Sequence, residues 1–125
     1  MAIEEKDRLG ALLKYEADKN YCRDIVTIVA GENLAMGTVL GRKNSDGTCK
    51  MVTVDNSVLD GTYTAYAVLL EDVDATEEAK EALIIARDAI VSKSALIYPE
   101  GATAAQKTQI LRMLQSNGIV ARDVA

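Results

Sequence analysis

The chain has 125 residues, which fits one domain that buries roughly two-thirds of its unfolded surface. Its net charge is −5 and it has no run of Lys or Arg, which disfavours nucleic acid as a partner because phosphate contacts need clustered cations. Histidine is absent, so the commonest general base and metal ligand is missing. The sequence has no stretch of 18 apolar residues, so no membrane span is predicted. Residues 1–7 lack the basic-then-apolar order of a secretory signal, so we expect the protein to stay where it is made.

Residues 1–24 are predicted to form an N-terminal arm. One face of a helix over this region is apolar, at positions i, i+3, i+4 and i+8: Leu9, Leu12, Leu13 and Ala17. A helix this short is marginal in water, and Gly10 weakens it further by roughly 1 kcal/mol relative to Ala. We therefore expect the arm to be mobile in the free protein and to become ordered against a partner. The alternative is a helix packed on its own domain.

Residues 25–125 are predicted to form a β-rich domain, and its first part reads as strands joined by tight turns. The expected strands are residues 25–29, 38–40 and 49–54. Turns are expected at residues 31–33 and 34–37, where Gly37 is available for a positive φ. The Asp-Gly pair in residues 44–47 predicts a hairpin turn between the second and third strands. A loop surrounds Val58 and Leu59.

Three short apolar runs follow, at residues 67–70, 82–86 and 89–91. They contain no polar residues at a 3.6 period, so we interpret them as strands buried on both faces rather than as helices. The acidic connector of residues 71–78 is expected to be a loop, and residues 77–81 a solvated loop or edge.

The clearest helix lies near the C-terminus. Thr103 and Gln106 match a capping box, and Asn117-Gly118 provides a left-handed stop. Between them Ile110, Leu111 and Leu114 form an apolar stripe, and residues 119–121 are expected to form a short closing strand. The fold class predicted is therefore mostly β, with one C-terminal α-helix and a flexible N-terminal arm.

No motif in the chain predicts catalysis, a cofactor or a bound metal. The spacing of Gly31, Gly37 and Gly41 is too wide for a dinucleotide fingerprint, and no phosphate-cradling loop is present. Glu71, Asp72 and Asp74 are either hard oxygen ligands for a divalent cation or a plain solvated loop, and their spacing favours the loop.

Cysteine and tyrosine side chains are the remaining candidates for function. Cys22 and Cys49 are expected to be reduced thiols, and without a histidine to act as base neither is expected to be a nucleophile, although Arg23 adjoins Cys22. Tyrosine suits interfaces because its ring is apolar and its hydroxyl polar. Tyr98, next to Pro99, is either an interface residue or a residue at the rim of the core.

Several segments, in order, resemble the lambda-type bacteriophage head decoration proteins. They are Asp24–Ile28, Gly31–Gly41, Ala67–Ala75, Arg87–Val91, Ser94–Pro99 and the helix that ends in Asn117–Val120. The resemblance covers roughly residues 20 to 122, and the order of the segments along the chain makes it specific to this family. Where the family often has Gly this chain has Ala67 and Asp88, and its Tyr98 stands where the family usually has Trp.

The resemblance implies a β-clip fold and a homotrimer that sits at three-fold sites on the outer surface of an expanded head. It would clamp the major capsid protein against the pressure of packaged DNA, after synthesis in the bacterial host cytoplasm. The arm would bind the capsid protein, with Leu9, Leu12, Leu13, Tyr15 and Tyr21 as candidate contacts. Tyr98 and Pro99 are candidates for the trimer interface. The expected partners are thus the protein itself and the major capsid protein, with no nucleic acid or membrane.

Two other functions stay open from sequence. A β-clip ligand-binding or enzyme-accessory domain would need a polar pocket near Gly37 to Gly41. A metal-dependent hydrolase ranks last, because the chain has no histidine.

Overall fold

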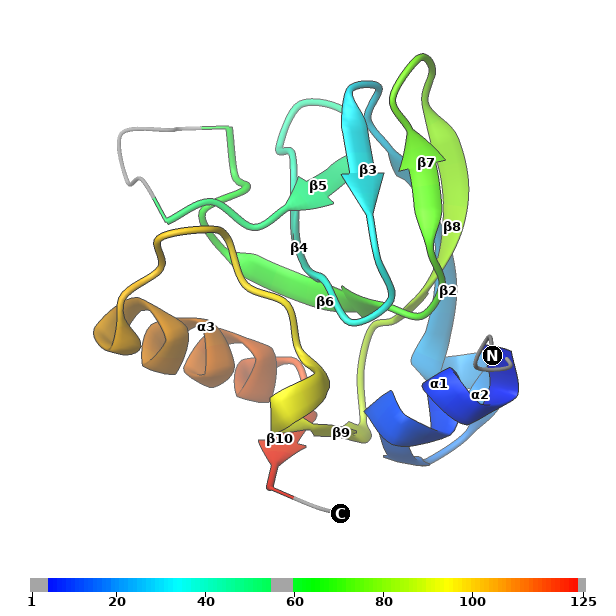
Figure 1. The fold of residues 1–125 in the computed structure, drawn as a ribbon, viewed down its shortest axis with the longest axis vertical. Coiled ribbons are helices and arrows are strands. Elements are labelled where there is room, and N and C mark those ends of the chain that lie inside the picture. Colours follow the sequence, from blue (N-terminus) through cyan, green and yellow to red (C-terminus); the bar gives the residue numbers. More distant parts are fainter. Residues whose placement is uncertain (1–4, 55–59, 124–125) are drawn as a thin grey trace.

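The computed structural model describes residues 5–54 and 60–123, which form a mostly β protein with one long C-terminal helix (Figure 1). In chain order the elements are α1 (Glu5–Leu12), β1 (Leu13–Glu16), α2 (Lys19–Cys22), β2 (Arg23–Ile28), β3 (Glu32–Leu34), β4 (Val39–Arg42), β5 (Cys49–Met51), β6 (Ala65–Leu69), β7 (Val73–Ala75), β8 (Lys80–Ile85), β9 (Ala89–Ser92), a 3-10 turn η1 (Lys93–Ala95), α3 (Ala104–Ser116) and β10 (Ile119–Arg122). No helix in this part of the chain is long and apolar enough to cross a membrane.

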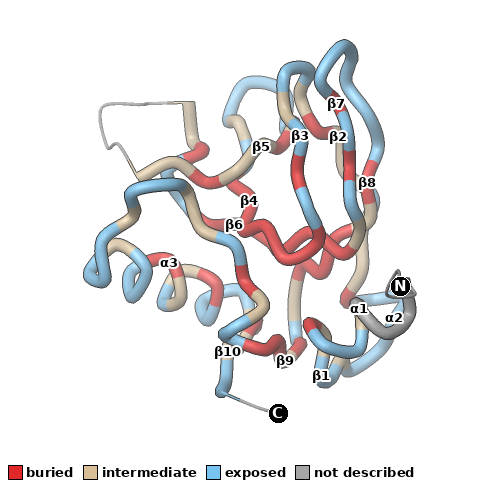
Figure 2. Tube along the Cα trace, viewed as in Figure 1, coloured by how far each residue is buried: buried red, intermediate tan, exposed pale blue. Residues whose placement is uncertain are grey.

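Five strands close into a barrel in the order β2-β5-β4-β6-β8. The predicted runs at residues 67–70 and 82–86 are confirmed as strands β6 and β8, which pair with each other. One face of these strands, with apolar residues of β2 and β4, fills one of two core clusters, in which Ile28, Leu40, Leu69 and Ile84 are fully buried. The opposite face, with Val39, Val68 and Ile85, belongs to the other cluster. Figure 2 shows most of β4 and β6 in red.

A second, three-stranded sheet has β9 at its centre. β1 pairs with β9 antiparallel and β10 pairs with it parallel, so the two ends of the chain lie on either side of one strand. α3 packs between this sheet and the barrel, and Ile110, Leu114 and Ile119 fill the other core cluster. The predicted strands at residues 89–91 and 119–121 are thereby confirmed.

The predicted signals at the ends of α3 are also confirmed. Thr103 Oγ1 accepts from the backbone N–H of Gln106 at 3.1 Å, and Gln106 Oε1 accepts from the N–H of Thr103 at 2.8 Å, which completes the capping box. Gly118 ends the helix with φ +81°. A Cβ at this position would lie 2.5 Å from Asp88 Oδ1, so the turn at Asp88, itself at φ +52°, packs directly against the glycine.

The hairpin turn is confirmed too, since residues 44–47 join the antiparallel strands β4 and β5 and Gly47 has φ +75°. The return strand is shorter than predicted, because β5 ends at Met51. The predicted loop around Val58 and Leu59 lies outside the described residues.

The predicted turns at residues 31–33 and 34–37 are present at Gly31 and Gly37, which have φ +97° and +98°, but residues 32–34 and 73–75 form strands, so the predicted loop throughout residues 71–78 is wrong. These segments contribute β3 and β7, which pair antiparallel with Leu34 opposite Val73 and Asn33 opposite Asp74. The physical reason is tertiary: Leu34, Val73 and Ala75 are buried against the barrel while Asn33 and Asp74 face solvent. Residues 77–81 are all exposed, as predicted, although the loop ends at Ala79 because β8 begins at Lys80.

Candidate interaction surfaces

The N-terminal segment, residues 5–23, contains five of the candidate contacts, and the structure separates them into two groups. Leu12 is buried in the core with 2% of its surface exposed, and Leu9 and Leu13 pack against the same cluster. Tyr15 and Tyr21 point outward and are 56% and 58% exposed. The segment therefore uses its leucines for attachment and leaves its tyrosines available for contact.

The predicted helical face that extends to Ala17 is wrong, because α1 ends at Leu12. From Leu13 the chain is extended and hydrogen-bonds to β9, with a bulge between Leu13 and Tyr15. Sheet pairing along β9 outweighs the helical spacing of the apolar residues. From its sequence this segment is either an arm that is mobile in the free protein or a helix packed on its own domain, and the contacts found here are those of a packed segment.

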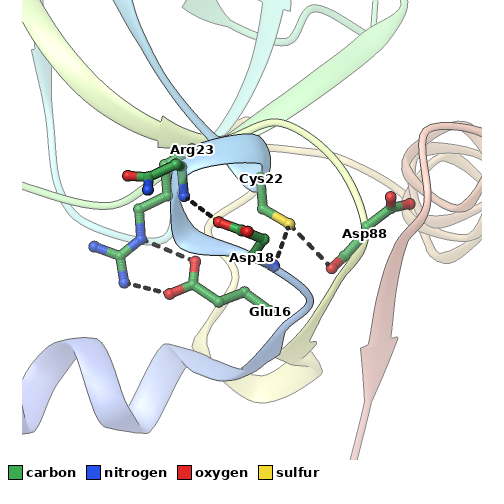
Figure 3. A network of polar contacts seen from close by, with 6 residues as sticks. Glu16, Asp18, Cys22, Arg23 and Asp88 are labelled. Carbon is green, nitrogen blue, oxygen red and sulfur yellow. Dashed lines mark hydrogen bonds and ion pairs between the residues drawn. The ribbon is translucent and has the colours of Figure 1, made fainter.

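Polar contacts join the end of β1 to the start of β2 and to the turn at Asp88 (Figure 3). The Arg23 guanidinium donates to both oxygens of Glu16, with Nε to Oε2 at 2.9 Å and NH2 to Oε1 at 2.8 Å. Only 17% of each side chain is exposed, so this bidentate pair is partly shielded from water. The backbone N–H of Ala17 donates to Asp88 O at 3.1 Å and ties the segment to the turn before β9.

Cys22 belongs to this network and is not accessible for chemistry. Its Sγ accepts from the N–H of Asp18 at 3.4 Å and lies 3.5 Å from Asp88 O, and the residue is fully buried. Cys49 is also a free, buried thiol, in the other core cluster. Burial raises the pKa of the Cys49 thiol to about 11, which keeps it protonated and unreactive at neutral pH.

Carboxylates of the acidic connector, residues 71–78, accept hydrogen bonds from other parts of the fold and from neighbouring residues. Glu71 Oε2 accepts from the N–H of Leu83 at 2.7 Å, and Asp72 Oδ1 accepts from the N–H of Met36 at 2.9 Å. Asp74 Oδ1 accepts from both the hydroxyl and the N–H of Thr76, and these bonds lower the pKa of the Asp74 carboxyl. No group of three or more potential metal ligands gathers in the described part of the chain.

Tyr98 and Pro99 lie at the edge of the core beside α3. Both are half-buried, and the Lys107 ammonium lies 5.3 Å from the centre of the Tyr98 ring. Burial raises the pKa of the Tyr98 hydroxyl. The ring thus serves as a rim residue of the core, and an additional role at a subunit interface stays a prediction.

Residues 37–41 form no polar pocket of the kind that a ligand-binding domain would need there. Gly37, Thr38, Val39, Leu40 and Gly41 are all buried. A Cβ at Gly37 would lie 2.3 Å from Ala95 O, and one at Gly41 would lie 2.3 Å from Thr62 O. The glycines therefore serve the close approach of two backbones, which weighs against the ligand-binding alternative.

Comparison with known protein families bears on the functional alternatives that the sequence leaves open. The family model for the bacteriophage lambda head decoration protein D matches residues 2–119. The chain belongs to this family. Head decoration proteins are structural components of the phage capsid, so membership indicates association with the capsid and a location on the virion. A search of curated proteins found no match.

Sequence reasoning missed one exposed residue on the barrel of this head decoration protein. Ile25 lies in a run of apolar residues that predicts a buried strand, yet 58% of its surface is exposed. Nothing in the local sequence distinguishes it from Ile28, which is fully buried in the same strand.

Proposed function

We propose that this protein binds the outer surface of an expanded phage head as a homotrimer at three-fold sites, where it clamps major capsid protein subunits against the pressure of packaged DNA. The match to the head decoration family over residues 2–119 carries the proposal. The net charge of −5 supports it, because a negative protein on the outer surface does not compete for the packaged DNA.

The segment before Ile25 is the proposed capsid-binding arm. Tyr15 and Tyr21 are more than half exposed and present large amphipathic surfaces at low cost in side-chain entropy. In this proposal Leu9, Leu12 and Leu13 hold the segment on the domain and so position the two tyrosines, which contact the capsid. One such segment binds modestly, but three on one trimer act at a high effective concentration, so the trimer binds far more tightly than a single copy.

Tyr98 and Pro99 are the proposed contribution to the trimer interface. Both keep part of their surface in solvent, and the Tyr98 ring is fixed in place by the core and by Lys107. A ring held rigidly at a surface loses little entropy when a neighbouring subunit covers it.

The test combines mass measurement with binding to expanded heads that lack their decoration protein. Light scattering on the wild type should give a trimer, or a monomer–trimer equilibrium. The double variant Tyr15→Ser and Tyr21→Ser should bind heads at least tenfold more weakly and keep its circular dichroism spectrum. Tyr63→Ser is the matched control, since Tyr63 is an exposed tyrosine, at 38%, outside the segment. A strictly monomeric wild type that does not bind heads would overturn the proposal.

A further inference from the structure

The barrel is closed by one residue pair between β2 and β5. β2 pairs with β8 along its whole length, from Arg23 opposite Ile85 to Ile28 opposite Lys80. On its other side β2 pairs with β5 only at Ile28 and Cys49. β5 begins where β2 ends, so residues 24–27 have a neighbouring strand on one side only.

The open side of β2 presents unpaired backbone groups. Cys22 O accepts from the N–H of Ala86 on the β8 side, whereas the N–H of Val29 donates to Cys49 O on the β5 side. Backbone groups alternate in direction along a strand, so even-numbered residues bond to β8 and odd-numbered residues face away from it. The N–H and C=O of Ile25 and the N–H of Thr27 therefore point out of the barrel seam, where no described strand meets them.

These groups face a depression of about 370 Å³, which we call the seam slot. One side is formed by residues 24–27 of β2, and the other by Arg42, Tyr66 and the turn at residues 46–48. Ile25, at 58% exposure, supplies an apolar surface at its edge. An open strand edge with an apolar flank is a surface to which an extended segment adds as a further strand.

Arg42 is the cation of the seam slot that has no carboxylate partner among the described residues. Asp24 is paired with Arg87, whose NH2 lies 2.6 Å from Asp24 Oδ2, and Asp46 Oδ1 accepts from the hydroxyl and N–H of Thr48. The Arg42 guanidinium stacks over Tyr66 at 4.6 Å and takes part in no ion pair with the described residues. Arg42 is thus a cation oriented by an aromatic ring, with no carboxylate assigned to it.

We propose that the seam slot binds an extended segment of the capsid shell by strand addition to β2, and that this segment carries a carboxylate for Arg42 and an apolar side chain for Ile25. The proposal rests on the proposed function, because association with the capsid supplies the partner. The seam slot lies on the barrel and is a second contact, separate from the exposed tyrosines of the N-terminal segment. Two separate contacts per copy would fix the orientation of the protein on the shell as well as its affinity.

Amide hydrogen exchange on the wild-type protein, free and bound to expanded heads, tests the proposal directly. In the free protein the amides of Asp24 and Val26 should exchange slowly because they bond to β8, and those of Ile25 and Thr27 should exchange rapidly. On heads the Ile25 and Thr27 amides should slow at least tenfold. Unchanged rapid exchange of both amides at full occupancy would overturn the proposal, and protection of both in the free protein would assign the seam slot to a second copy instead.

Two substitutions at one position separate the backbone contact from the side chain. Ile25→Pro removes an N–H that β8 does not use, so the ladder to β8 is kept while strand addition is blocked. Ile25→Ala keeps that N–H and loses the same apolar surface. Ile25→Pro should bind heads at least tenfold more weakly than Ile25→Ala, with similar melting temperatures, and equal binding by the two would overturn the proposal.

Arg42→Gln should weaken head binding severalfold, and raised salt should weaken the wild type more than this variant. A wild type that does not bind heads at all overturns the proposed function together with this inference. A wild type that binds heads with full occupancy and shows none of the Ile25 and Thr27 effects overturns the seam slot alone.

Discussion

The two ends of the chain are attached to the same strand by different means. β10 joins β9 through a regular parallel register from Ile119 to Arg122, and α3 covers the junction with fully buried Leu114. β1 joins the other side of β9 through a short antiparallel register that a bulge interrupts. The C-terminal end is therefore part of the framework, whereas the N-terminal end is attached by Leu12 and a polar network.

Within this sheet, the region that stabilises the fold is therefore distinct from the region proposed to bind the capsid. A region that must stay folded buries its apolar residues completely, as α3 and β10 do. The proposed capsid-binding segment instead keeps two large side chains outside, Tyr15 on β1 and Tyr21 on α2. Substitutions at the two ends should accordingly differ in size and in what they affect.

The largest effect is expected in the framework. Leu114→Ala removes a fully buried side chain between α3 and the barrel, and it should lower the free energy of unfolding by about 2–5 kcal/mol. Chemical denaturation followed by circular dichroism measures the loss. A loss below about 1 kcal/mol would mean that α3 is not part of the cooperative core.

Gly118→Ala should be the next most costly change. Position 118 has φ +81°, and the added Cβ would meet Asp88 Oδ1 at 2.5 Å and Asp88 N at 3.0 Å. Strain and overpacking together should cost about 2 kcal/mol or more. Gly10→Ala is the control, because a Cβ there meets nothing within 4 Å. Thermal melting of the two variants should show a drop for the first and no drop for the second.

Leu12→Ala tests the other end of the comparison. Leu12 is almost as buried as Leu114, but its loss cannot cost more than detachment of the N-terminal segment from the body. We therefore expect a loss of about 2 kcal/mol or less, together with faster amide exchange in β1 and unchanged exchange in α3. A loss as large as that of Leu114→Ala would show that both ends belong to one cooperative unit.

Glu16→Gln should have a smaller effect, confined to the same segment. It removes the charge that faces the Arg23 guanidinium in a pair with 17% of each side chain exposed. The loss should be about 1 kcal/mol, and it should shrink as salt is raised. The double variant Glu16→Gln and Arg23→Gln shows whether the two side chains act together: equal losses in the single and double variants would support the pair.

The smallest effect is expected at a turn that belongs to neither end. Hydrogen bonds from the Thr62 hydroxyl and N–H lower the pKa of the Asp60 carboxyl below its ordinary value of 3.8. A carboxyl with a lowered pKa adds stability above pH 3.8, and that stability is lost as the pH falls through the folded-state pKa. Asp60→Asn should therefore melt below the wild type at pH 7, and the difference should narrow as the pH falls through the folded-state pKa of Asp60, which lies below 3.8. A constant difference across this range would contradict the assignment.

Features with a local physical cause could be predicted from the sequence. The capping box at Thr103, the glycine stop at Gly118 and the hairpin turn at Gly47 each depend on a few neighbouring residues. The short apolar runs of β6 and β8 could also be predicted, because continuous aliphatic residues without polar residues at a 3.6 period indicate a buried strand.

Features that depend on a distant partner could not be predicted. β3 and β7 are only three residues long, and each becomes a strand because the other lies beside it. Helical spacing in residues 9–17 was overridden by β9, which is more than 70 residues away in sequence. Ile25 is exposed because side chains alternate along β2, and Val26 and Ile28 are the ones that face the core; the apolar run itself does not show which face is buried.

The position of β9 between both ends of the chain also determines how the molecule would carry mechanical load. A pull applied before α1 first meets the packing of Leu9 and Leu12 and then the short β1–β9 register. That register would shear while α3 and β10 stay in place, because they hold β9 from the opposite side. If the N-terminal segment binds the capsid as proposed, deformation of the shell would pull on this segment. The rest of the domain would keep its fold, and the segment could pack on it again.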